Sequence, residues 1–185
     1  MAESNNVYIR HVRPQDRREF LALMCASKAL HMPWITPPLN QATFAQYIAR
    51  TNREDHEGFV VARYSDDAIV GVVNLNNIVR GSFLSASLGY YVGAPYLGQG
   101  YMLDGLNLVK NHAFTALQLH RLEANIQPTN ERSLKLVQRA GFVREGIAPA
   151  FLFLDGAWRD HERWSCVDQR ETMLLPPTQP TGTKP

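Results

Sequence analysis

The stretch "GYYVGAPYLGQGYMLDGL", residues 89–106, contains the most informative change of pattern in the sequence. An apolar, aromatic run stops at Gly93-Ala94-Pro95, Gly98 and Gly100 follow, and apolar residues then recur at helical spacing. A strand that ends in a glycine-rich turn before a helix leaves the first amides of that helix unpaired. Those amides and the helix dipole attract an anion, commonly a phosphate, and glycines let the backbone approach it closely. The stretch therefore predicts either a phosphate site or only a turn, since it is neither a Walker loop nor a dinucleotide fingerprint.

The rest of the chain alternates between strand-like and helix-like patterns separated by proline and glycine breaks. Period-two alternation and short apolar runs predict strands at 7–13, 58–64, 68–79, 82–92, 120–126, 142–154 and 157–167. Helical spacing predicts helices at 14–29, 41–51 and 98–117, and another that is capped by Thr129 or Asn130 and stopped by Gly141. This order predicts an α+β domain with a mixed, mostly antiparallel sheet of six to seven strands flanked by about four helices. We expect the domain to span residues 1–175, followed by a disordered proline-rich tail at 176–185.

Length and composition are those of a single globular domain. The chain has 185 residues, of which 45% are hydrophobic and 19% are charged. A formal net charge of +2 is too small to predict direct nucleic-acid binding, which usually shows as a clustered basic face. Cys25 and Cys166 lie far apart without metal-type spacing, which indicates reduced thiols. No signal peptide and no run of about 18 apolar residues is visible, so we expect a cytoplasmic protein without membrane contact.

A second motif, "NERSLKLVQRAGF" at 130–142, is typical of a capped amphipathic helix that ends at a glycine. Together with the glycine turn, at this separation, it resembles the GNAT superfamily of acetyl-CoA-dependent N-acetyltransferases. Within that superfamily, "NIVRGSF", "LGYYVG…YLGQGYM", "HRLEANIQPTNERS" and "LDGAWRDH" are most similar to the RimJ/RimL type, named for ribosomal protein substrates. The resemblance covers roughly residues 7–168. It implies the GNAT (acyl-CoA N-acyltransferase) fold, acetyl-CoA as co-substrate, and no metal.

The resemblance also implies where acetyl-CoA binds. The family's pyrophosphate signature falls on residues 97–102, where Gly100 matches the central glycine while Leu97 and Met102 depart from the pattern. Strand residues 90–92 should pair with the pantetheine arm as an added strand would. Asn130 matches the asparagine that hydrogen-bonds that arm, and either Arg132 or Arg139 could reach the 3′-phosphate or remain solvated. The expected cofactor-binding residues are Tyr90, Tyr91, Val92, Leu97, Gly98, Gln99, Gly100, Tyr101, Met102, Asn130, Ser133 and Arg139.

The implied reaction is direct attack of an amine on the thioester carbonyl. It needs a neutral amine, a donor for the oxyanion and a proton for the departing thiolate. The amide near Val92 is the expected oxyanion donor. Many relatives protonate the thiolate with a tyrosine at the position that Val137 occupies, so Ser133 becomes the candidate, with helix capping as its alternative role.

The general base has several candidates. Glu123 lies in a strand among apolar residues, where burial would raise its pKa, or it serves as a structural partner of Arg121. Asn125, on the same strand face, could orient a water. His31 and His161 are further candidates, although a single histidine often has no catalytic role.

The acceptor groove is expected between the first two helices and the hairpin tips. Trp34 either walls the groove or packs its own loop, and Asp160 either holds the amine by its charge or pairs with Arg159 or Arg163. The expected acceptor residues are His31, Trp34, Asn74, Asn76, Arg80, Trp158 and Asp160.

The identity of the amine follows in part from the energy needed to deprotonate it. An α-amine of pKa about 7.8 costs about 0.4 kcal/mol to deprotonate at roughly pH 7.5, whereas a lysine of pKa about 10.4 costs about 4 kcal/mol. A site without an obvious strong base therefore suits a protein N-terminus, such as that of a ribosomal protein, better than a lysine. The alternatives are a small amine such as a polyamine, an amino acid or an aminoglycoside, or an acetyl-CoA-binding module without turnover. We expect a monomer or a homodimer.

Overall fold

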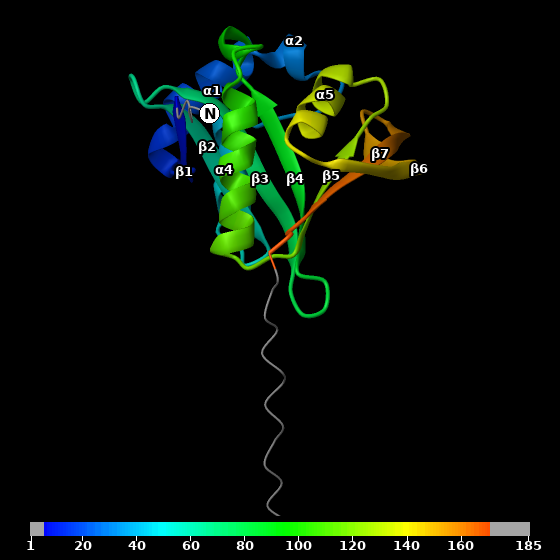
Figure 1. Ribbon diagram of the computed structural model, residues 1–185. Helices are drawn as coiled ribbons and strands as arrows, with labels where there is room; N and C mark the ends of the chain where they lie inside the picture. Colours follow the sequence, from blue (N-terminus) through cyan, green and yellow to red (C-terminus); the bar gives the residue numbers. More distant parts are fainter. Residues whose placement is uncertain (1–5, 171–185) are drawn as a thin grey trace, which may run out of the picture.

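The structure, a computed structural model, describes residues 6–170 (Figure 1). The strands are β1 Val7–His11, β2 His56–Arg63, β3 Ile69–Val79, β4 Ser85–Val92, β5 Arg121–Ile126, β6 Val143–Leu154 and β7 Ala157–Val167. The α-helices are α1 Arg17–Ala26, α2 Lys28–His31, α3 Gln41–Thr51, α4 Tyr101–Thr115 and α5 Glu131–Arg139. Two 3₁₀ turns, η1 Pro14–Asp16 and η2 Ala94–Tyr96, precede α1 and follow β4. The predicted α+β class and the order of elements are confirmed, while the expected tail at 176–185 lies outside the described residues.

All seven strands form one sheet in the order β1-β2-β3-β4-β5-β7-β6. Every pairing is antiparallel except that between β4 and β5, which α4 connects. One apolar cluster, which includes Leu106, Val109 and Val137, packs α4 and α5 on one face of the sheet. A second cluster, which includes Phe20 and Phe44, packs α1 and α3 on the other face. Figure 1 shows α4 in front of the sheet, while the β6–β7 hairpin extends to one side.

The first helix is shorter than its sequence pattern predicts. The expected helix at 14–29 is divided into η1, α1 and α2, and the break falls at Ser27, whose φ of −102° and ψ of 5° leave the helical region. The buried Ser27 hydroxyl donates to the Leu23 carbonyl at 2.7 Å and accepts from the Ala94 amide at 2.8 Å. This tertiary hydrogen bond joins the end of α1 to the turn after β4, so α2 lies beside the end of that strand.

Helix α4 packs closely on the sheet because of a glycine in its second turn. A Cβ on Gly105 would lie 2.6 Å from the Val61 side chain, closer than any real contact. The close approach fixes the N-terminal end of α4 against the sheet.

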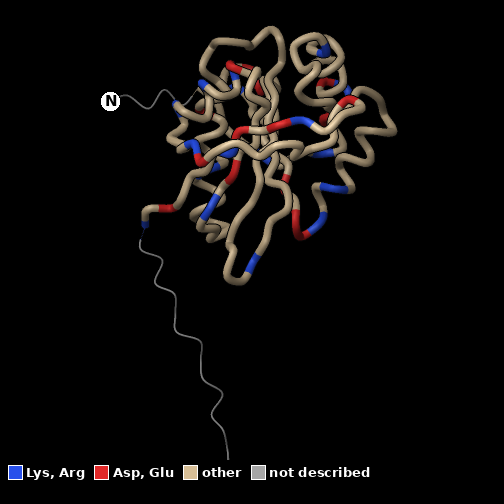
Figure 2. Tube along the Cα trace, turned by 90° about the vertical axis from the view of Figure 1, so that its right-hand side faces the viewer, with Lys and Arg blue, Asp and Glu red and all other residues tan. Residues whose placement is uncertain are grey.

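Charged residues are distributed over many elements. Figure 2 shows acidic and basic positions interspersed along the described trace. Among residues 6–170, no helix is long and apolar enough to cross a bilayer.

Candidate active site

Strands β4 and β5 pair over four residues, which is half of the eight-residue β4 and two thirds of the six-residue β5, and this opens the sheet. Their parallel register runs from Ser85 opposite Arg121 to Leu88 opposite Ala124 and stops there. Beyond that point lies a groove of about 780 Å³, lined by the end of β4, the start of α4, the end of β5, α5, α2 and the β6–β7 hairpin. Residues 89–92 thus present a strand edge to the groove.

The exposed edge of β4 is held in place by a histidine. His31 of α2 is 4% exposed and lines the groove, and its Nε2 donates to the Val92 carbonyl at 2.8 Å. Burial lowers the pKa of His31 below its usual value, so the ring is neutral near pH 7. Because the N–H and C=O of a strand residue point to the same side, the Val92 amide also faces this side of β4. This is the position expected for an oxyanion donor.

The glycine turn after β4 forms one end of the groove. Gly98 and Gly100 have φ angles of +77° and +86°, and both line the groove. Gly100 is the N-cap of α4, and the first paired amides of that helix are those of Leu103 and Asp104. The backbone amides that precede these two residues can therefore bind an anion, as the predicted phosphate site requires.

The residues expected around this turn differ in how they meet the groove. Leu97 and Met102 line it, whereas the Gln99 side chain donates to the Pro95 carbonyl at 2.7 Å. The Tyr101 ring packs against Tyr96 at 6.2 Å between ring centroids. Neither Gln99 nor Tyr101 is among the residues that line the groove.

Helix α5 supplies the opposite wall. Asn130 is its N-cap, and the Asn130 Oδ1 accepts from the Ser133 amide at 3.2 Å. This bond uses one oxygen and leaves the Nδ2 group of Asn130 available to a ligand in the groove. Asn130, rather than Thr129, is thus the cap.

Three cations of α5 lie along the groove. Arg132 and Arg139 both line it, and so does Lys135, which the sequence analysis missed. The three residues recur at intervals of three and four, so helical spacing alone could have found Lys135. Together they give the groove a positive wall suited to the phosphates of a nucleotide.

Ser133 and Tyr90 meet across the groove. The two hydroxyl oxygens lie 2.5 Å apart, and either can donate. Burial raises the pKa of Tyr90, so this phenol stays protonated over the whole physiological range. When Tyr90 donates, the Ser133 proton is free to point at a departing thiolate.

Two groove residues carry buried polar atoms that lack a partner among the described residues. These atoms are the Nδ1 of His31 and the Oδ1 of Asn125. Buried polar groups are nearly always hydrogen-bonded. A ligand in the groove, or a water bound with it, would supply the partners that these two atoms lack. Asn125 therefore remains a candidate for orienting a polar group of the substrate.

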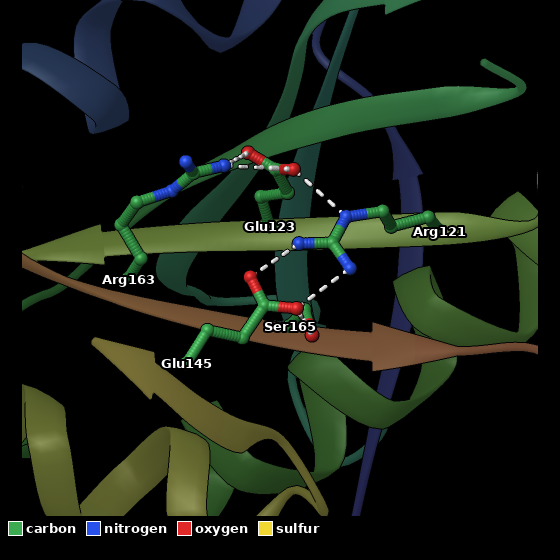
Figure 3. Close-up of polar contacts among 5 residues, drawn as sticks. All are labelled: Arg121, Glu123, Glu145, Arg163 and Ser165. Atoms are coloured by element: carbon green, nitrogen blue, oxygen red, sulfur yellow. Dashed lines mark hydrogen bonds and ion pairs between the residues drawn. The ribbon is translucent and has the colours of Figure 1, made fainter.

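Glu123 occupies a different place from the one that a base requires. Figure 3 shows its carboxylate between Arg121, whose Nε donates at 2.8 Å, and Arg163, at 3.3 Å. Arg121 also binds Glu145 in a bidentate pair, and the Ser165 hydroxyl donates to Glu145 at 2.8 Å. This network joins β5, β6 and β7, and Glu123 is absent from the groove lining. The structure thus favours the structural alternative for Glu123.

His161 of β7 has the arrangement of a usable base. The ring is 2% exposed and lines the groove, and its Nδ1 donates to the Arg159 carbonyl at 2.9 Å. Because a carbonyl oxygen can only accept, Nδ1 carries the N–H, and in the uncharged ring the lone pair is on Nε2. The Nε2 of His161 has no hydrogen-bond partner within residues 6–170, and it is not among the fully buried atoms. No other base candidate combines these two properties within the described residues.

The expected acceptor residues divide into two sets. His31 and Trp34 line the groove, but Asn74, Asn76 and Arg80 do not. Asn74 is buried and accepts from the Tyr47 hydroxyl at 2.6 Å, and the Asn76 side chain donates to the Ser87 carbonyl at 3.4 Å. The Arg80 guanidinium donates to the Leu117 carbonyl. Because Arg80 precedes β4 and the groove lies at the other end of that strand, its placement as a groove wall is wrong.

The two expected hairpin residues also lie outside the groove. Trp158 is 64% exposed and packs edge-on against Phe153. Asp160 accepts from the Ala150 amide at 2.8 Å, and so pairs with neither arginine proposed for it. This bond holds a bulge between Ala148 and Leu152 in β6. The bulge is followed by Leu152 and Leu154, two groove residues that no sequence signal indicated.

The comparisons with known proteins agree with this geometry. Residues 6–143 match the acetyltransferase (GNAT) domain family. "Probable N-acetyltransferase YjcK" of Bacillus subtilis is 29% identical over 170 residues, which are 88% of this chain and 94% of that protein. The ribosomal protein uS5-alanine N-acetyltransferase of Escherichia coli is 43% identical over 93 residues, which are 50% of this chain and 48% of that protein.

A solved structure shows the same fold with a bound coenzyme. RimJ of Mycobacterium smegmatis, in complex with CoA-disulfide, is 29% identical with a TM-score of 0.78, over 87% of this chain and 81% of that chain. The resemblance to the RimJ/RimL type is thereby confirmed. The strand edge, the glycine turn and the cationic wall of the groove fit the arm and the phosphates of acetyl-CoA. The chain belongs to the GNAT family and is an acetyl-CoA-dependent N-acetyltransferase.

Proposed function

We propose that the acceptor is the N-terminal α-amine of a protein, and of a ribosomal protein in particular. The observation that carries this proposal is the composition of the groove: no Asp or Glu is found among the described residues that line it. A polyamine or a lysine side chain is cationic and needs carboxylates to bind it and a base to deprotonate it. An α-amine depends less on such carboxylates and on such a base, because its pKa of about 7.8 leaves a large fraction of the amine neutral near pH 7.5.

The similarity to a uS5-alanine N-acetyltransferase supports the ribosomal part of the proposal. That protein's name specifies an alanine of ribosomal protein uS5. By analogy, a small first residue would lie near Trp34 and His31, on the α2 side of the groove. The apolar ring of Trp34, and the absence of acidic groups from the described part of the groove lining, suit an uncharged first side chain.

The proposed reaction uses the groove residues in three steps. The neutral amine attacks the thioester carbonyl, and the Val92 amide stabilises the oxyanion that forms. The Nε2 atom of His161, directly or through one water, receives the proton that the amine loses as the C–N bond forms. When the C–S bond breaks, the Ser133 hydroxyl, held by Tyr90, donates to the thiolate, and solvent restores the proton.

A thiol-release assay with acetyl-CoA and three acceptor classes tests the proposal. The first class contains peptides with a free Ala or Ser N-terminus, and the second contains the same peptides with a blocked N-terminus and one lysine. The third contains polyamines and aminoglycosides. We expect release only with the first class, whereas release only with polyamines or aminoglycosides would keep the fold and overturn the acceptor.

The role of His161 is tested separately with His161→Asn. The Nδ2 of Asn lies where the imidazole Nδ1 lies, so the variant keeps a donor toward the Arg159 carbonyl but cannot take up a proton. We expect a loss in kcat of about 100-fold or more with an unchanged Kd for acetyl-CoA. A variant with the wild-type kcat would remove His161 from the mechanism.

A further inference from the structure

A cluster of three metal-ligating side chains lies outside the groove. His11 ends β1, Glu57 is in β2, and His112 is in the last turn of α4. One ligand atom from each residue can be chosen so that all three lie within 4.8 Å of one another. The residues are far apart in the sequence, and no motif in the sequence analysis indicated them. They meet because α4 packs against β1 and β2.

The cluster is already ordered by its surroundings. The Glu57 Oε2 and the His112 Nε2 lie 2.9 Å apart. The buried ring of Phe59 packs against both imidazoles, at 4.6 Å from His11 and 5.0 Å from His112 between ring centroids. All three side chains project from regular elements rather than from loops, so their separation is fixed by the packing of the helix on the sheet.

Two imidazole nitrogens and one carboxylate oxygen form a donor set that divalent transition metals prefer. In catalytic zinc sites, two histidines and one glutamate bind the ion at about 2.0–2.2 Å, with water as the fourth ligand. Tetrahedral ligands at that distance lie about 3.3 Å apart, close to the separation already present between Glu57 and His112. His11 is exposed, so the fourth position is open to water. The ligand atom of His11 lies within 4.8 Å of the other two, so a movement of about 1.5 Å or less brings it to the tetrahedral separation.

We propose that His11, Glu57 and His112 bind a divalent transition-metal ion, and zinc in particular. The cluster contains imidazole nitrogens and a carboxylate oxygen but no thiol. Calcium and magnesium prefer all-oxygen ligands, so this mixed donor set favours a transition metal over either of them. The site is separate from the groove, because His112 lies 11 residues after Tyr101, the first residue of α4. At about 1.5 Å per residue this is roughly 16 Å along the helix. The metal therefore takes no part in acetyl transfer and stabilises the contact of α4 with β1 and β2.

The test is a zinc titration of the untagged protein against a chromophoric chelator. We expect one zinc ion per chain. Loss of a residue that merely supports a metal ligand already lowers metal affinity by roughly 10- to 100-fold. Loss of a ligand itself should cost more, so His112→Ala and His11→Ala should each weaken zinc binding by at least about 100-fold. Thermal denaturation with and without zinc gives a second readout, since a ligand that binds only the folded state raises the Tm. The variants should lose this increase in Tm.

Two control variants distinguish the cluster from other zinc ligands. His120→Ala removes an exposed histidine outside the cluster, and Cys25→Ser removes an exposed thiol. Both should bind zinc as the wild type does. Because a ligand variant that failed to fold would be uninformative, each is first shown to keep the wild-type Tm, within a few degrees, in the presence of a chelator. Zinc affinity that is unchanged in both histidine variants, or that is lost in Cys25→Ser, would overturn the proposal.

Discussion

Asn130 is expected to serve both the stability of α5 and the binding of acetyl-CoA, and substitutions can separate the two. Its Oδ1 accepts from the Ser133 amide at 3.2 Å, a helix cap whose removal costs about 1 kcal/mol of folding free energy. Its Nδ2 is available to the pantetheine arm, and a buried hydrogen-bond partner of this kind contributes about 1–3 kcal/mol. Asn130→Ala should therefore lower stability by about 1 kcal/mol and raise the Kd of acetyl-CoA by roughly 5- to 150-fold.

Two further variants make the reasoning refutable. Asn130→Asp keeps an oxygen that caps the helix but loses the amide donor, so its stability should be retained while acetyl-CoA binding is weakened. Asn40 caps α3 in the same way, accepting from the Thr43 amide at 3.0 Å, and does not line the groove. Asn40→Ala should therefore lose similar stability and keep the wild-type Kd. Calorimetry gives each Kd and urea denaturation gives each free energy of unfolding. Wild-type affinity in both Asn130 variants would refute the assignment.

Three other outcomes are expected. Ser133→Ala should lower kcat by roughly 100-fold or more and leave the Kd of acetyl-CoA unchanged, because the Ser133 hydroxyl is needed only when the thiolate departs. Wild-type turnover of this variant in a steady-state assay would exclude Ser133 from the chemistry. Gly100→Ala should lower the free energy of unfolding by about 1–2 kcal/mol, since a φ of +86° disfavours any side chain. No atom lies within 4 Å of the added Cβ, so the loss would come from the backbone conformation and not from a clash. An unchanged urea midpoint would contradict this. The hydrogen bonds from Arg121 hold the pKa of Glu145 at about 2, below the usual 4.5, so its contribution to stability is present above about pH 4.5 and is lost as the pH falls toward 2. The stability difference between the wild type and Glu145→Gln, followed by denaturation across this range, should shrink toward low pH, and a difference independent of pH would show that this ion pair is not the cause.

The order of elements could be predicted from sequence because each pattern is local. The second predicted helix, 41–51, agrees with α3 at both ends, since Asn40 provides a cap that the sequence shows directly. The break at Ser27 could not be predicted, because it depends on a hydrogen bond to Ala94, which is distant in sequence. Local signals fix the type of an element, and tertiary contacts fix where it ends.

More of the expected cofactor residues than of the expected acceptor residues line the groove, for a physical reason. Gly98, Gly100 and Asn130 act through backbone conformation and helix caps, which follow from their own positions in the sequence. Glu123 and Asp160 act through partners on other strands, so the sequence could not choose between a catalytic and a structural role. In the structure both carboxylates are engaged, one by arginines and the other by a backbone amide in a bulge.

The most direct test of the account uses a single peptide with both a free N-terminal alanine and an internal lysine. After incubation with acetyl-CoA and the enzyme, tandem mass spectrometry locates the acetyl group. The account predicts acetylation of the α-amine with the lysine unmodified, because the described groove lining provides no carboxylate to bind the lysine or to lower the cost of deprotonating it. Acetylation of the lysine, at a rate equal to or above that of the α-amine, would contradict the proposed acceptor.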